Sequence, residues 1–355
     1  MAKQKQKNAL TAPNDESFEN VQLNLFQTFL CNTEEERDQL SNTIDLWDSI
    51  PRYSISRQEI NKRRTKEGFL DLLTIEFQYH GQPLVASIQP ARIREAGGTS
   101  VDYYPSASEE LIEDALRKIA TECYQGFFDK QSYRSGVVFS LYTLRQELRR
   151  RGHSRSYQEL MKSLMILSGS MIELRTKGNG EVEGFARSAY FPVLSAVSRK
   201  RIADDPKARW IVQFHPLVTQ SINALTYRQF NYAQMMKFST QLARWLHKQL
   251  SLKFTFASYI NNFEMRYSTI KRDSQLLRYK RERDNRAALD EAFRDLAEDR
   301  IIAGLIREEI TGPRGRITDV SYTITPSMQF ISEMKASNKR RRKAVDKFPV
   351  NSIIR

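Results

Sequence analysis

The alternation of apolar and polar positions in residues 69–88 predicts a β-hairpin. Residues 80–83 (HGQP) break the alternation between two short apolar runs. Further along, Ser106 and Glu109 have the spacing of a capping box, and the apolar residues behind them recur with a helical period. We therefore expect a pair of strands followed by a helix with one buried face.

Residues 137–197 have the pattern of a helix-turn-helix followed by a hairpin. A short β-branched and aromatic run leads into a leucine stripe that stops at Gly152. After a tight turn, Ser156 and Glu159 form a second capping box ahead of another amphipathic helix. Two apolar stretches around the turn at residues 177–180 then predict a hairpin. Together these elements predict a winged helix.

A second series of elements begins at Trp210. We expect a strand at 210–214, a helix opened by Pro216, and helices within 236–250, 259–265 and 279–302. Residues 301–324 again have the pattern of strand, glycine turn and strand. Because the order of elements repeats that of the first half, the sequence predicts a structural duplication.

The predicted fold class is α+β, with two tandem winged-helix DNA-binding domains, a flexible N-terminal arm and a basic C-terminal tail. Asp204, Asp205 and Pro206 are breakers that mark a linker. The expected divisions are an arm at 1–45, a first domain for dimerisation and auxiliary DNA contacts at 46–198, a sequence-specific domain at 199–335, and the tail at 336–355.

The net charge of the chain indicates the kind of partner that it binds. The chain has 56 Lys and Arg against 42 Asp and Glu, a formal charge of +14, which favours a polyanion such as DNA. Cys31 and Cys123 are far apart and form no metal-binding motif, and no apolar run approaches the roughly 18 residues of a membrane span. We expect a cytoplasmic protein that has no membrane partner.

The densest basic block lies at the front of the longest predicted helix, whose later half is acidic. This asymmetry is typical of a recognition helix, which inserts its N-terminal residues into the major groove, where arginine can bind guanine through two hydrogen bonds. The alternative is a solvated helix with mixed charges. The expected DNA-binding residues of this domain are Lys271, Arg272, Arg278, Lys280, Arg281, Arg283 and Arg286, with Arg314 and Arg316 at the tip of the following hairpin.

Two other basic features carry weaker signals. Arg155, Ser156 and Lys162 lie at the start or on the exposed side of the second helix of the first domain, where they are candidates for auxiliary DNA contacts. The alternative is that this domain serves dimerisation. The basic run at residues 339–343 is typical of a disordered cationic arm that adds nonspecific, salt-sensitive affinity.

The sequence contains no motif for catalysis, and we expect no enzyme activity, cofactor or metal. A GxxxxGK phosphate loop is absent, and the four histidines (His80, His153, His215 and His247) show no metal-ligand spacing. A nickase with a tyrosine nucleophile would need such a metal cluster, so the tyrosines are interpreted as core and DNA-facing aromatics.

Two segments resemble plasmid replication initiators of the TrfA and RepA type. Residues 214–218 (FHPLV) and 241–250 (QLARWLHKQL) are similar to a strand, a helix start and a further helix in the second winged helix of that family. The resemblance implies a dimer that binds direct repeats (iterons) at an origin, opens A·T-rich DNA and engages the replicative helicase and host initiator. It also implies repression of its own gene. A plasmid or phage transcriptional regulator with the same domains is the alternative.

One short motif favours the replication function. Gln22, Leu23, Asn24, Leu25 and Phe26 (QLNLF) resemble the peptide by which bacterial replication proteins bind the sliding clamp. The resemblance implies that Leu25 and Phe26 fill an apolar pocket of the clamp. The alternative is an amphipathic helix, because Val21, Leu25 and Phe29 also have helical spacing.

Overall fold

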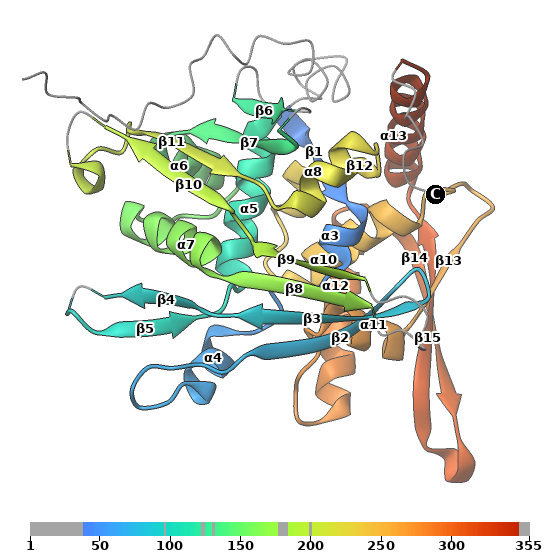
Figure 1. Cartoon of the computed structure of the whole chain (residues 1–355). Helices are drawn as coiled ribbons and strands as arrows, with labels where there is room; N and C mark the ends of the chain where they lie inside the picture. The colour runs from blue at the N-terminus through green and yellow to red at the C-terminus, as the bar shows by residue number, and fades with distance from the viewer. Residues whose placement is uncertain are drawn as a thin grey trace, which may run out of the picture.

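The computed structural model describes residues 38–95, 97–121, 125–129, 132–176, 184–198 and 201–347. These residues build a mixed α/β molecule, shown in Figure 1. Its buried apolar residues form two hydrophobic cores. The first core is made of buried residues between Ile44 and Met236, and the second of buried residues between Phe238 and Met334. We call the segments around these cores the first and second units.

The first unit combines short helices with antiparallel sheets. Its helices are α3 (Asp45–Ser49), α4 (Arg57–Arg63), α5 (Ala107–Ala120), α6 (Leu141–Arg150), α7 (Tyr157–Gly169), η2 (Ile202–Asp204), α8 (Pro216–Asn223) and α9 (Tyr232–Met235). Its strands are β1 (Leu40–Ile44), β2 (Leu73–Tyr79), β3 (Gln82–Gln89), β4 (Ala91–Arg94), β5 (Ser100–Tyr103), β6 (Gly126–Asp129), β7 (Arg134–Phe139), β8 (Met171–Thr176), β9 (Phe185–Ala189), β10 (Val193–Val197), β11 (Arg209–Gln213) and β12 (Tyr227–Asn231).

Two larger sheets enclose the first core, in the orders β2-β3-β8-β9 and β10-β11-β7-β6. The predicted hairpin is confirmed as β2 and β3, in which Ile75 and Phe77 are buried while Glu76 between them is exposed. Helix α5 lies in the middle and contacts α6, α7 and β7. Both predicted capping boxes are confirmed, at the starts of α5 and α7.

The second unit has a simpler arrangement. Its elements are α10 (Gln241–Lys253), β13 (Phe263–Arg266), α11 (Tyr267–Ser274), α12 (Glu282–Glu298), β14 (Ile302–Thr311), η3 (Pro313–Gly315), β15 (Ile317–Pro326) and α13 (Met328–Lys347). The strands form one antiparallel sheet in the order β13-β15-β14. Leu289, Phe293 and Leu296 of α12 are buried in the second core, as their spacing predicted.

The second unit has the order helix, strand, helix, helix, strand, strand, and the first unit has a similar order with one extra strand, β6, between its helix α5 and its strand β7. In the second unit the elements are α10, β13, α11, α12, β14 and β15, and their strands share one sheet. In the first unit the corresponding elements are α5, β7, α6, α7, β8 and β9, but β7 lies in a different sheet from β8 and β9. The two units therefore resemble each other in the order of their elements, but their strands pair differently.

The structure differs from the sequence expectation near the boundary of the units. Trp210 was expected to begin the second domain, yet β11 pairs with β7 and β10, and Trp210 is buried in the first core. The segment taken for a linker instead joins two neighbouring strands of one sheet. The two cores divide between Met236 and Phe238, whereas the expected domain boundary was at residues 198 and 199.

Three further elements differ from their expected form. The helix expected at 259–265 is wrong, because Phe263–Arg266 pairs with β15 as a strand. The long helix begins at Glu282 and not at Tyr279, since hydrogen bonds between Asn285 and the backbone of Tyr279 (2.8 and 3.1 Å) accompany a non-helical segment there. The basic run expected in a disordered arm lies on helix α13, whose Phe330, Ile331 and Met334 are buried.

A buried ionic network joins the two units. Lys248 of α10 contacts Asp114 and Glu110 of α5, at 2.6 and 3.2 Å. Arg117 of α5 contacts both Asp114 and Asp48, at 2.6 and 2.7 Å, and all of these side chains are almost fully buried. Burial alone would raise the pKa of Asp48, but Arg117, Lys248 and Arg52 together hold it well below its usual range. Asp48 therefore stays ionised although it is buried.

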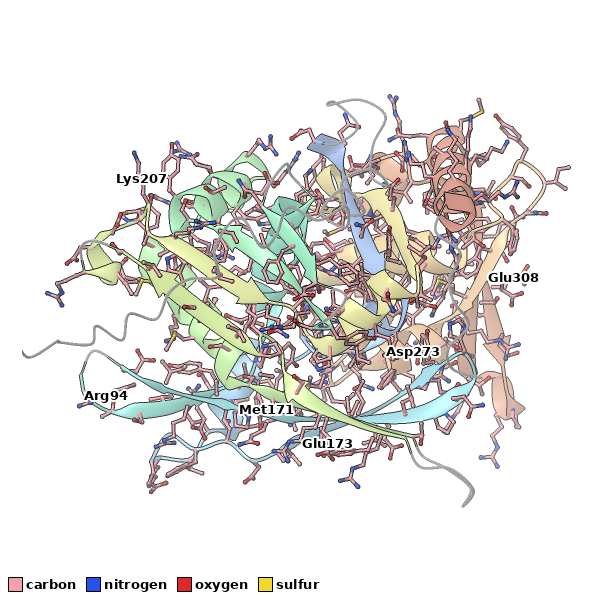
Figure 2. All side chains as sticks on the ribbon, turned by 45° about the horizontal axis from the view of Figure 1, so that its top comes forward. Arg94, Met171, Glu173, Lys207, Asp273 and Glu308 are labelled. Carbon is pink, nitrogen blue, oxygen red and sulfur yellow. The ribbon has the colours of Figure 1, made fainter. Side chains whose placement is uncertain are left out.

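Helix α11 provides another contact between the units. The backbone amide of Gln78 at the end of β2 donates to the carboxylate of Asp273 at 3.4 Å. Figure 2 labels Asp273 where the second unit approaches the β2–β3 hairpin. The edge of β2 is thus partly covered by the second unit.

Candidate nucleic-acid interface

A groove of about 700 Å³ opens in the second unit between α11, the start of α12 and β15. Its lining includes the basic side chains of Lys271, Arg272, Arg278 and Arg286. The hydroxyl and the amide of Ser268 at the start of α11 donate to Asp319 of β15, at 2.5 and 3.0 Å. These bonds hold the helix against the sheet and fix the width of the groove.

Of the nine cations predicted to bind DNA in the second unit, four have protein partners. Lys271 pairs with Glu282, Arg272 with Asp273 at 2.7 Å, and Arg283 with Asp284 at 3.2 Å. The guanidinium of Arg278 donates to the hydroxyl of Ser54 in the first unit at 3.2 Å. Burial, with repulsion from Arg63, lowers the pKa of Arg278. These four residues therefore already have a structural role.

The other five cations form a distinct group, which we call the free basic set. Their side chains make no hydrogen bond or ion pair to any residue that the structure describes, and all are exposed except Arg286, which is half-buried. The set consists of Lys280, Arg281, Arg286, Arg314 and Arg316. Lys280 and Arg281 lie just before α12, Arg286 is the fifth residue of that helix, and the other two members lie at the tip of the β14–β15 hairpin.

The hairpin extends well beyond the body of the molecule in Figure 1. Its strands pair from Ile302 with Pro326 to Thr311 with Ile317. At the tip, Arg314 and Gly315 both have left-handed backbone conformations, with φ of 66° and 68°. Such a turn is tight for a residue with a Cβ atom, and it leaves the Arg314 side chain in solvent. Glu308, labelled in Figure 2, lies along the hairpin and not at its tip.

Sequence reasoning missed the acidic residues that shape the groove. Glu282 begins α12 and accepts hydrogen bonds from both Lys271 and the hydroxyl of Tyr267. Asp319 anchors Ser268 from β15. In the sequence, acidic residues within a basic block only lower its net charge, and the structure is needed to show which cation each one pairs with. A carboxylate in the first turn of a helix was the available signal for Glu282.

The candidates of the first unit make contacts within that unit. The hydroxyl of Ser156 caps α7 by accepting from the amide of Glu159 at 3.2 Å. Lys162 pairs with Glu95 at 2.8 Å and donates to the hydroxyl of Tyr103. Arg155 donates to the neighbouring carbonyl of Ser154. None of the three lines the groove of the second unit.

The predicted clamp peptide, residues 22–26, lies outside the described residues. Among the residues that are described, no group of three or more His, Cys, Asp or Glu is placed to hold a metal ion. Within the same ranges, no helix combines the length and apolar character that a bilayer span requires.

No protein-family model and no curated protein sequence matches the chain. Among solved structures, domains 2 and 3 of RctB are similar, with a TM-score of 0.45 and 12% identity over 72% of this chain and 91% of that one. A second structure of these domains gives 0.44 and 12%, covering 75% and 94%. The Pi initiator protein in complex with iteron DNA gives 0.42 and 9%, covering 62% and 91%.

Proposed function

We propose that the second unit is a winged helix that reads duplex DNA in a sequence-specific manner. In this arrangement α12 is the recognition helix and the β14–β15 hairpin is the wing. The observation that carries the proposal is the free basic set, in which cations without protein partners among the described residues gather at the front of α12 and at the hairpin tip. Recognition helices contact bases with their N-terminal residues, and wings reach the backbone or minor groove.

The ion pairs indicate which cations are available to contact DNA and which have a structural role. Arg281 and Arg286 are available to donate to base edges, because neither is committed to a carboxylate in the described part of the chain. We propose that Arg314 and Arg316, which are exposed at the hairpin tip, contact phosphates or the minor groove beside the site of α12. Lys271 and Arg272 shape the groove through their pairs with Glu282 and Asp273. We propose that Arg155 makes an auxiliary backbone contact from the first unit.

We further propose that this DNA recognition serves replication initiation at an origin with direct repeats. The support is the resemblance of residues 214–218 and 241–250 to TrfA-type and RepA-type initiators. Each segment also has a structural role. His215 of the first segment caps α8, and Lys248 of the second lies on α10 and belongs to the buried ionic network. In this proposal the protein opens A·T-rich DNA and engages the replicative helicase and host initiator, and it acts in the cytoplasm without a cofactor.

A plasmid assay tests the initiator function against the alternative of a transcriptional regulator. A replicon whose only origin is the DNA adjacent to this gene should be maintained when the protein is supplied. Double substitution of Leu25 and Phe26 by alanine should abolish maintenance and binding of the purified clamp, while leaving duplex-DNA affinity unchanged. Repression of the gene without plasmid maintenance would support the regulator and overturn the initiator.

We propose that the first unit forms a dimer in the absence of DNA. The sheet order places β2 at an edge, where α11 contacts the end near Gln78, and Phe69 and Leu72 just before its other end are 50% and 58% exposed. Such an edge can extend the sheet of a second copy. Sedimentation of the full-length protein at micromolar concentration should give a dimer, and Leu72→Glu should shift it toward a monomer. A monomer over the whole concentration range would rule out this interface.

A further inference from the structure

The basic run near the C-terminus lies on a helix that is attached to the first unit. Helix α13 contacts β12, and the hydroxyl of Ser337 donates to the carbonyl of Gln229 at 3.2 Å. The guanidinium of Arg340 donates to the side-chain oxygen of Gln229 at 2.9 Å. The amide of Asn338 donates to the carbonyl of Thr255 at 2.8 Å. These contacts hold the basic run in a fixed position.

Arg228 of β12 lies directly beneath this run. It is 8% exposed, its Nε atom has no hydrogen-bond partner, and its terminal nitrogen donates to the neutral side chain of Asn338. No carboxylate lies within ion-pair distance of Arg228 among the described residues. A buried charge without a counter-ion is costly, so this site favours an anion.

Arg341 of α13 increases the cost of keeping Arg228 charged. Burial lowers the pKa of Arg228 to about 10, and repulsion from Arg341 of α13 contributes to the same shift, whereas Asp45 opposes it. A cavity of about 20 Å³ between β12 and α13 is lined by Arg228, Arg340 and Arg341. This volume admits roughly one oxygen atom and leaves the rest of an anion in solvent. A phosphate oxygen has the size and charge to fill it.

The surroundings favour a chain of phosphates over a single free anion. Lys339, Arg342 and Lys343 are exposed on the same helix, close to the cavity along the chain. Several exposed cations near one another can neutralise successive phosphates of a nucleic acid. In Figure 1 the C-terminal end of α13 is at the top of the view, whereas the tip of the β14–β15 hairpin is at the bottom. The basic residues of α13 and those of the hairpin tip therefore lie on different sides of the molecule.

We propose that Arg228, Arg340 and Arg341 form a phosphate-binding site through which α13 holds a second DNA segment, separate from the one bound at α12. This inference goes beyond the proposed function, because it requires two DNA contacts on one protein. A protein of this kind can bring a second segment of the origin, or another duplex, to the repeat that α12 occupies.

A capture assay on the full-length protein tests the site. The protein is bound to an immobilised duplex that carries its repeat, and capture of a labelled random-sequence duplex is measured as salt is raised. Arg341→Gln should reduce capture at least about fivefold and lower the slope of log affinity against log salt by about 0.9, the value for one lost phosphate contact. Lys335→Gln is the matched control, because Lys335 lies earlier on α13, over the Tyr259 ring.

The remaining outcomes separate this proposal from the proposed function. Affinity for the immobilised repeat should be unchanged in Arg341→Gln, and the variant lacking Arg281 and Arg286 should still bind random duplex through α13. Equal capture by wild type and Arg341→Gln would overturn the site. If inorganic phosphate raises the melting temperature through Arg341 but random duplex neither binds there nor displaces it, the nucleic-acid assignment is overturned.

Discussion

Replacing Arg281 or Arg286 by alanine is expected to weaken binding to the cognate repeat by about 1 to 3 kcal/mol, or roughly 5- to 150-fold, for each residue that reads a base. Affinity for random duplex should change little, since a base-edge contact adds nothing on unrelated sequence. The physical reason is the free guanidinium of each residue at the front of α12. Fluorescence anisotropy with both duplexes at one salt concentration measures the two affinities.

Arg294→Ala is the matched control for this pair. Arg294 is exposed on the same helix, about 12 Å further along the axis than Arg286, so the substitution removes an equal charge away from the groove. Its effect on cognate DNA should be small. If Arg281→Ala and Arg286→Ala weakened cognate and random DNA by the same factor, both residues would be phosphate contacts, and base reading would have to be sought elsewhere.

Replacing Arg117 by methionine is expected to lower the free energy of unfolding by about 3 to 5 kcal/mol. The substitution leaves Asp48 and Asp114 buried with fewer counter-charges, and an unpaired buried charge is strongly destabilising. Arg63→Met is the control, because its pair with Glu59 is solvent-exposed and contributes at most about 1 kcal/mol. Urea unfolding followed by circular dichroism measures both. Equal effects of the two substitutions would contradict the role of the network.

The same network predicts a dependence on pH. The pKa of Asp48 is depressed in the folded protein, so its contribution to stability is complete above the unfolded value of about 3.9. That contribution is lost as the pH falls from there toward the folded pKa. Wild type should therefore lose stability below about pH 4. Arg117→Met should lose less over the same interval, because without Arg117 the folded-state pKa of Asp48 is less depressed.

Local signals in the sequence were sufficient for many elements. The capping boxes at Ser106 and Ser156 confirm that helix starts are encoded by neighbouring residues. The β2–β3 hairpin and the buried stripe of α12 follow from periodicity alone. The basic front of α12 was also visible, since charge asymmetry along a helix needs no tertiary information.

Contacts between distant residues could not be predicted in this way. Residues 263–266 form a strand only because β15 lies beside them, and β11 belongs to the first core because β7 and β10 flank it. The contact of Lys248 with Asp114 joins residues far apart in the chain. For the candidate site, sequence showed a block of cations, but it could not show that Glu282 and Asp273 neutralise Lys271 and Arg272 while leaving Arg281 free.

Selection of bound sequences from a pool of random duplexes tests the central claim most directly. The full-length protein should enrich one defined sequence, and the variant with Arg281 and Arg286 both replaced by alanine should lose the preference at particular base pairs while still binding DNA. Arg294→Ala should enrich the same sequence as wild type. Enrichment of an unchanged sequence by the double variant, or of no sequence by wild type, would contradict the claim that the front of α12 reads DNA.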